Sequence, residues 1–161
     1  MRDIDILGVP VDHGANRRGV DMGPSAIRYA GLFHALRSMG LSCRDLGDIP
    51  VPVPEFSDNR VVDRERNRAV LGQVTRDLFR AMSDSLAQGR FPVVLGGDHS
   101  LAMGSVLGAR KVLGDMGLLW IDAHGDFNTL KTSPTGNYHG MALSAVLGAA
   151  DDGLASLLGP D

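Results

Sequence analysis

Short apolar segments alternate with longer helix-like segments along most of this chain, and this order constrains the fold more than any other feature. Strands are predicted at residues 4–9, 41–46, 91–95 and 118–121, and helices at residues 24–39, 61–88, 100–113 and 139–147. Strands that alternate with helices form right-handed crossovers and a mainly parallel sheet. We therefore predict an α/β fold, a three-layer sandwich with helices on both faces of the sheet, formed by one domain over residues 1–161.

Composition narrows the classes of protein that this chain can represent. Its 161 residues include 16 Lys plus Arg and 19 Asp plus Glu, for a formal charge of −3, and 43% of them are hydrophobic. This supports a buried core and argues against a broad basic face for nucleic acid or an anionic membrane. No apolar run has the length of a membrane span and the start lacks a signal peptide, so we expect a cytoplasmic protein.

The single cysteine, Cys43, excludes an internal disulfide framework and a cysteine-rich zinc site. Any metal bound by this chain must therefore be held by histidine and carboxylate side chains. Three proline residues at positions 50, 52 and 54 predict a stiff connector outside the sheet.

A first polar motif, Gly-Gly-Asp-His-Ser at residues 96–100, directly follows the predicted strand 91–95. The two glycines allow a sharp turn that would present His99 at the carboxyl end of the strand. A purely structural interpretation is equally open, in which Asp98 or Ser100 caps the next helix and His99 only packs.

A second motif, Asp-Ala-His-Gly-Asp at residues 122–126, follows the predicted strand 118–121. In an extended segment Asp122, His124 and Asp126 would project to the same side. Two carboxylates and an imidazole so close together repel and desolvate one another unless a cation lies between them. The alternative is a solvated acidic loop, which the apolar character of the preceding strand disfavours.

Both motifs lie at the carboxyl ends of predicted strands, where ligands gather in parallel α/β sheets. Imidazole and carboxylate ligands without a thiolate favour a fairly hard divalent metal, and manganese suits them better than a structural zinc does. Metal ions of this kind hold a hydroxide nucleophile at neutral pH. Metal-assisted hydrolysis is therefore the reaction class that the sequence predicts.

The motifs at residues 96–100 and 122–126, together with Gly-Asn-Tyr-His-Gly-Met at residues 136–141, occur in the order seen in the ureohydrolases, the family of arginase, agmatinase and formiminoglutamase. Residues 17–31 resemble the bacterial arginases in particular, and the resemblance extends from residue 4 to about residue 147. It implies a manganese-dependent hydrolysis of L-arginine to L-ornithine and urea, through a hydroxide that bridges two metal ions.

The resemblance also implies roles for individual residues. His99 and Asp126 would bind one manganese ion, His124 the other, and Asp122 would bridge both. Asp126 would in addition orient the hydroxide. His139 matches the family's proton-transferring or substrate-contacting histidine, which suits a leaving amine that needs a proton near neutral pH. A helix-start histidine that only caps is the structural alternative.

Three polar residues match positions where arginases contact the α-carboxylate of their substrate: Asn128, Thr135 and Asn137. Amide and hydroxyl donors suit a carboxylate at a wet rim. Agmatine lacks that carboxylate, so the trio favours arginine. Thr135 stands where a serine is more usual in the family, which keeps the hydroxyl and adds a methyl group.

The chains of this family continue well beyond residue 161. Their later portion carries an Asp-x-Asp pair that completes both metal sites. It also supplies the strands that lie between the third and fourth strands of the sheet. We therefore expect the N-terminal portion of a bacterial arginase, with an incomplete sheet and weak or single-metal binding. A trimer or hexamer is expected of the full-length protein. The alternatives are an agmatinase-like enzyme and a non-catalytic half-domain that binds metal or another subunit.

Overall fold

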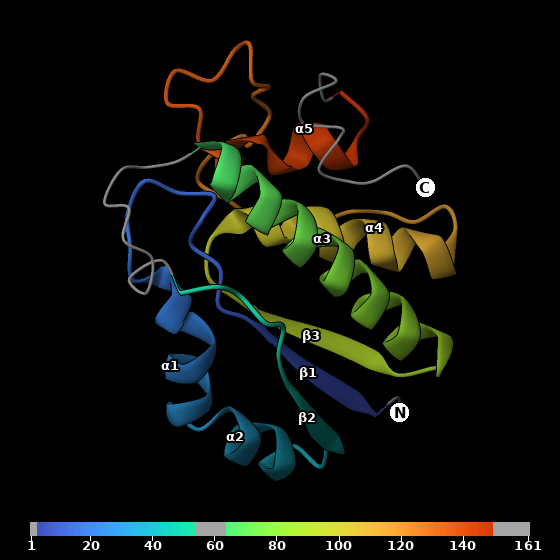
Figure 1. Ribbon diagram of the computed structural model, residues 1–161. Coiled ribbons are helices and arrows are strands. Elements are labelled where there is room, and N and C mark those ends of the chain that lie inside the picture. The colour runs from blue at the N-terminus through green and yellow to red at the C-terminus, as the bar shows by residue number, and fades with distance from the viewer. Residues whose placement is uncertain (1–2, 54–63, 150–161) are drawn as a thin grey trace.

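A three-stranded parallel sheet forms the centre of the protein, as the computed structural model shows for residues 3–53 and 64–149 (Figure 1). The strands are β1 (Ile4–Val9), β2 (Cys43–Asp48) and β3 (Phe91–Gly96), in the order β2-β1-β3. Ile4 is paired with Cys43 on one side and with Phe91 on the other. All six residues of β1 are buried, as expected for a central strand covered on both faces.

Helices cover both faces of the sheet. On one face, α1 (Gly23–Tyr29) and α2 (Leu32–Ser38) lie near an apolar cluster formed by Ile4, Ile6 and Leu95 with the side chains of α2. On the other face, Leu7 and Val9 pack against α3 (Arg64–Ala87) and α4 (Ala102–Leu113). Alternate residues of β1 thus face opposite layers, and the predicted three-layer α/β arrangement is confirmed.

The single helix predicted over residues 24–39 is wrong in one respect, because the structure divides it into α1 and α2. Gly31 lies between the two helices with φ of 97°, a left-handed conformation that ends one helix and begins the next at a different angle. Glycine adopts this conformation without the steric penalty of a Cβ atom. The change of direction lets both short helices lie against the same face of the sheet (Figure 1).

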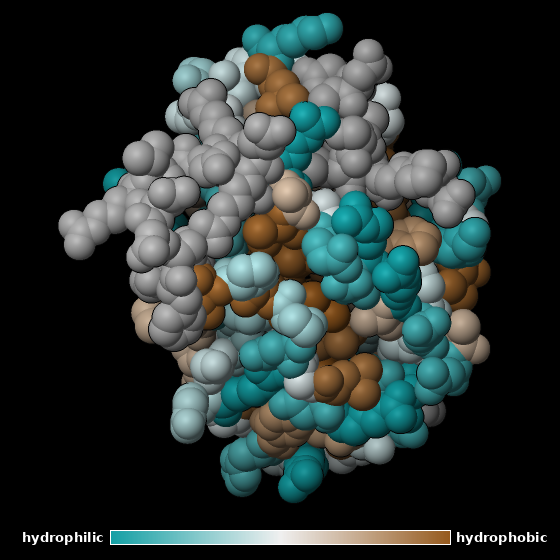
Figure 2. Space-filling model, viewed as in Figure 1, coloured by the Kyte–Doolittle hydropathy of each residue, from teal (hydrophilic) through white to brown (hydrophobic). Residues whose placement is uncertain are grey.

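The long helix α3 matches the prediction over residues 61–88 except at its start, where residues 61–63 lie outside the described residues. Its buried face carries Leu71, Val74 and Leu78, which pack on Met103 of α4. Hydrophilic side chains are interspersed with hydrophobic ones along the outer face of α3 (Figure 2). No helix within residues 3–53 and 64–149 is both long enough and apolar enough to cross a membrane.

Residues 50–53 form no strand, as the proline spacing predicts, while Pro54 lies outside the described residues. The last described helix is α5 (Ala142–Val146), preceded by a 3-10 turn at Tyr138–Met141, and its Ala142 and Ala145 join the core beside α3 and α4. These two elements replace the one short helix predicted over residues 139–147.

The strand predicted at residues 118–121 is wrong for this structure. The segment pairs with no strand among the described residues, and the exposed fractions of Leu119 and Ile121 are 83% and 87%. A strand needs a neighbouring backbone to satisfy its amide and carbonyl groups, and within residues 3–53 and 64–149 no strand pairs with the outer side of β3. Trp120 alone of this segment packs against the core.

Candidate metal centre

The loop after β3 presents His99 at the carboxyl end of the sheet. Asp98 precedes a 3-10 turn at His99–Leu101, and its carboxylate accepts the backbone amide of Ser100 at 2.9 Å. The capping interpretation of this motif is therefore confirmed for Asp98. It does not compete with the functional one, because His99 points away from the cap and its side chain is 39% exposed.

Three side chains converge beyond this loop. The Nδ1 atom of His99 lies 2.8 Å from Oδ2 of Asp122 and 2.8 Å from Oδ2 of Asp126. One ligand atom from each of the three residues lies within 4.8 Å of the others, a separation that a single bound cation can span. The donor set of one imidazole nitrogen and two carboxylate oxygens fits a fairly hard divalent metal such as Mn²⁺.

The charge state of the centre favours a cation. The backbone amide of His124 donates a hydrogen bond of 2.8 Å to Oδ1 of Asp122. This hydrogen bond and the facing His99 lower the pKa of the Asp122 carboxyl below its ordinary value, and they outweigh the opposing effect of burial. Asp122 is thus ionised at neutral pH, beside the buried Asp126. The centre offers two adjacent carboxylates to a metal and only one imidazole to balance them.

His124 is not brought into the three-residue group. Its side chain is 83% exposed, and its Nδ1 atom lies 3.4 Å from Oδ1 of Asp122. The segment 122–126 is not the extended strand end on which the sequence argument relied, because the Asp122 side chain accepts the amide two residues on and Asp126 adopts a positive φ of 46°. Alternation along a strand therefore does not apply here.

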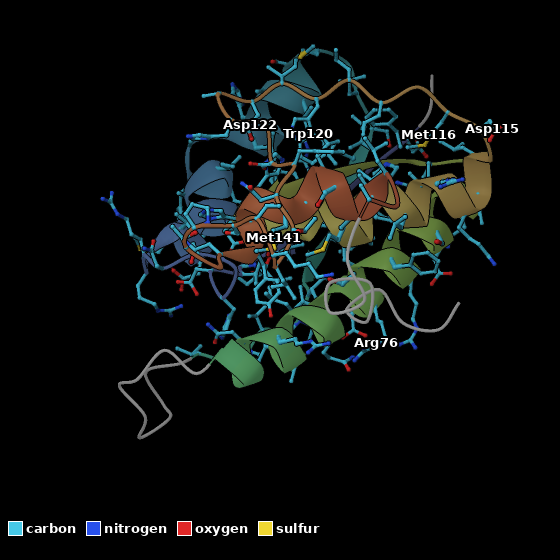
Figure 3. All side chains as sticks on the ribbon, turned by 90° about the horizontal axis from the view of Figure 1, so that it is seen from above. Arg76, Asp115, Met116, Trp120, Asp122 and Met141 are labelled. Carbon is cyan, nitrogen blue, oxygen red and sulfur yellow. The ribbon has the colours of Figure 1, made fainter. Side chains whose placement is uncertain are left out.

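Trp120 supports the imidazole of His99 from behind, a contact that the sequence did not predict. The two rings stack with centroids 4.5 Å apart and planes inclined by 28°. In Figure 3, the segment from Asp115 to Asp122 runs along one side of α4, while α3 lies on the other. Trp120 and Asp122 lie close together on this segment, so it supplies both a candidate ligand and the ring that stacks on His99.

A cleft of about 630 Å³ opens over the metal centre. Every residue that the sequence singled out for binding or catalysis contributes to its wall: His99, Asp122, His124, Asp126, Asn128, Thr135, Asn137 and His139. Phe127, Ser133 and Pro134 also line the cleft and were not predicted. Nothing in their residue types distinguishes them from ordinary loop residues.

The loop between the metal centre and α5 is held by backbone hydrogen bonds. Asn128 donates its amide to the carbonyl of Gly140, and its own carbonyl accepts the hydroxyl of Ser144 at 2.6 Å. The Asn128 side chain accepts the hydroxyl of Thr132, and the Thr135 hydroxyl accepts the amide of Asn137. The three predicted carboxylate-binding residues thus lie in one turn-rich loop that faces the cleft.

A second cavity of about 330 Å³ shares Thr135 and Asn137 with the cleft. Its other walls include the buried His13, which belongs to none of the sequence motifs described above, and Asn67 of α3. Both residues are far in the sequence from the motifs at residues 96–100 and 122–126, so the sequence does not indicate that they lie near the cleft.

These observations define a class of protein. An imidazole and two carboxylates gathered beyond the carboxyl end of a parallel sheet, beneath an open cleft, define an α/β protein with a candidate metal-binding centre. Comparison with known proteins then gives the family. The model of the arginase family matches residues 2–156, so this chain belongs to the arginase family.

Individual relatives support the same family assignment. The chain is 46% identical over 159 residues to an arginase of Bacillus caldovelox, and this match covers 99% of this chain and 53% of that protein. It is 44% identical to an arginase of Bacillus subtilis, over 98% of this chain and 52% of that protein. The native structure of the Bacillus caldovelox arginase superposes with a TM-score of 0.88 at 45% identity, covering all of this chain and 54% of that one. The chain therefore spans about half the length of the relatives that it matches.

An arginase from Entamoeba histolytica, whose structure is a complex with L-ornithine, matches with a TM-score of 0.82 at 27% identity over 99% of this chain and 54% of that one.

Proposed function

We propose that the function of this chain is the manganese-dependent hydrolysis of L-arginine to L-ornithine and urea. The chain either carries out this reaction itself or forms the metal-binding half of a protein that does. The observation that carries the proposal is the convergence of His99, Asp122 and Asp126 beneath a cleft. Membership of the arginase family supports the reaction class.

Manganese is the metal that these donors suit. His99, Asp122 and Asp126 would hold one ion, and His124 beside Asp122 would contribute to a second after its exposed side chain turns inward. When bound, such ions lower the pKa of a water molecule enough to supply a nucleophile at neutral pH. That chemistry is needed because the guanidinium carbon is resonance-stabilised and a poor electrophile.

The protein's own residues provide the remaining elements of the reaction. Hydrolysis joins a water oxygen to the guanidinium carbon and breaks the bond from that carbon to the side-chain nitrogen of ornithine. Asp126 is buried beside His99 and would accept a hydrogen bond from the attacking water. His139 lines the same cleft and would deliver the proton that the departing amine requires.

The rim of the cleft favours an amino acid over a simple amine. Asn128, Thr135 and Asn137 offer neutral amide and hydroxyl groups where an α-carboxylate would need donors. Agmatine has no carboxylate to use them. The Entamoeba histolytica relative was solved with L-ornithine, which has the same α-carboxylate as arginine.

Two other functions remain candidates, an agmatinase-like hydrolase and a non-catalytic half-domain that binds metal or another subunit. The exposed apolar segment at Leu119 and Ile121 favours the half-domain, because such a surface suits contact with further polypeptide. The cytoplasmic location and the trimeric or hexameric assembly stay predictions from the sequence.

Urea release separates these functions. We would measure it from arginine and from agmatine, with and without Mn²⁺, beside a calorimetric titration with Mn²⁺. The variant His99→Ala should abolish both activity and metal binding, whereas His34→Ala, an exposed histidine on α2, should change neither. Metal binding without urea indicates the half-domain, a preference for agmatine indicates the agmatinase, and the absence of both binding and urea refutes the proposal.

A further inference from the structure

The loop after β1 lies between the two loops that carry His99 and His139. The carbonyl of Val11 accepts the amide of Asp98 at 2.7 Å, and the carbonyl of Val9 accepts the amide of Gly97 at 3.0 Å. The pairing of β1 with β3 therefore continues past the ends of both strands. This places the residues after Val11 directly beside the motif at residues 96–100.

Gly14 is bonded to both loops at once. Its amide donates to Oδ2 of Asp98 at 2.7 Å, and its carbonyl accepts the amide of His139 at 3.1 Å. Gly14, 84 positions before Asp98 in the sequence, thus links the loop that carries His99 to the turn that carries His139.

The carboxylate of Asp98 has no direct part in the metal centre and is saturated by internal donors. It is buried, and its second oxygen, Oδ1, accepts both the amide and the hydroxyl of Ser100, at 2.9 and 2.5 Å. Buried hydrogen bonds to a charged acceptor are among the stronger ones in proteins. Asp98 therefore fixes the first turn after His99 and the position of Gly14 together.

The approach between these residues leaves no room for a side chain at position 14. A Cβ atom added to Gly14 would lie 2.6 Å from Oδ1 of Asp98 and 2.8 Å from Oγ of Ser100. Both atoms belong to short, buried side chains that have little freedom to move away. Any substitution at Gly14 must therefore separate this loop from Asp98.

We infer that Asp98 and Gly14 are positioning residues, which set the separation of His99 and His139 across the cleft through one continuous chain of hydrogen bonds. The inference rests on the proposed function, because it assigns to His99 the binding of Mn²⁺. A merely structural role would make the two residues matter for the stability of the fold and not for metal affinity in particular.

The test compares Gly14→Ala and Asp98→Asn with Gly117→Ala, a glycine whose added Cβ meets no atom within 4 Å. Calorimetric titration with Mn²⁺ measures metal affinity, thermal unfolding measures stability, and hydrogen exchange measures protection of the His139 amide. We expect Gly14→Ala and Asp98→Asn to weaken Mn²⁺ binding by about tenfold or more, as loss of groups that orient metal ligands commonly does, and to speed exchange at His139. Gly117→Ala should leave both unchanged.

The outcomes separate this inference from the proposed function. If the wild-type chain does not bind Mn²⁺, the proposed function fails, while exchange at His139 still shows whether the Gly14 link exists. If both variants fold and bind Mn²⁺ as the wild type does, or lose only thermal stability, the positioning role is overturned. Should Gly14→Ala not fold, Asp98→Asn decides. Should neither fold, rapid exchange of the His139 amide in the wild type overturns the inference, and slow exchange supports it.

Discussion

The backbone carbonyl of Asp126 accepts the amide of Leu143, at the start of α5, over 3.0 Å. Asp126 is also the only residue other than glycine with a positive φ within residues 3–53 and 64–149. Its main chain is thus anchored to a helix, while its side chain reaches Nδ1 of His99. A strained backbone that directs a charged group into a cleft is a feature of functional sites.

Asparagine tolerates the left-handed conformation of Asp126 better than alanine does, so the two substitutions should differ. Asp126→Asn should keep the free energy of unfolding close to that of the wild type but weaken Mn²⁺ binding at least tenfold, because it removes a charged ligand. Asp126→Ala should lose metal affinity and also about 1 kcal/mol of stability. Urea denaturation and metal titration measure the two effects. The exposed Asp115→Asn is the control, and equal stability of the asparagine and alanine variants would contradict the argument from strain.

Binding of Mn²⁺ should stabilise the fold. The ligands come from segments far apart in the sequence, so an ion held by His99, Asp122 and Asp126 binds the folded chain and not the unfolded one. At a free metal concentration about a hundredfold above the dissociation constant, the gain is about 2.7 kcal/mol. A thermal melt with increasing Mn²⁺ should show a rising Tm for the wild type and for His34→Ala. A similar rise in His99→Ala would place the metal elsewhere.

Acid should weaken the sheet at the end opposite the cleft. Asp5 of β1 is buried and accepts hydrogen bonds from Arg44 at 2.7 Å, Ser85 at 2.7 Å and Arg90 at 2.5 Å. Burial alone would raise the pKa of the Asp5 carboxyl, but these three partners outweigh it and lower the pKa from 3.8 to about 2.

The folded pKa of Asp5 lies below the unfolded one, so its contribution is complete above about pH 4 and is lost as the pH falls through about 2. The full effect is roughly 2 kcal/mol. We expect the free energy of unfolding between pH 6 and pH 2 to fall more steeply in the wild type than in Asp5→Asn. Asp115→Asn, an exposed control, should follow the wild type. Parallel profiles for the wild type and Asp5→Asn would show that Asp5 does not titrate in this range.

Periodicity and turn residues predict most of the fold, because they reflect local chemistry. The apolar residues of β1 and the spacing of Val74 and Leu78 on α3 indicate the correct element types and the layer order. The segment at residues 118–121 has an equally apolar pattern, yet it forms no strand. Its pairing depends on a neighbouring strand, which a local pattern does not reveal.

The ligand motifs likewise predict which residues line the cleft but not their geometry. The sequence indicated an extended alternation of Asp122, His124 and Asp126, whereas a turn within the motif turns His124 outward. The stacking of Trp120 on His99 arises only when two distant segments meet. Contacts of this kind follow from tertiary packing and carry no signature in a single sequence.

A pair of leucine substitutions tests the placement of the apolar segment directly. Leu78 of α3 is fully buried between layers, whereas Leu119, in the segment predicted as a buried strand, is largely exposed. Leu78→Ala should lower the free energy of unfolding by about 2–5 kcal/mol, because it removes buried methyl groups and leaves a cavity. Leu119→Ala should change it by less than about 0.5 kcal/mol, as exposed substitutions usually do. Urea denaturation of both variants provides the measurement. A large loss for Leu119→Ala would mean that residues 118–121 are buried against a strand after all.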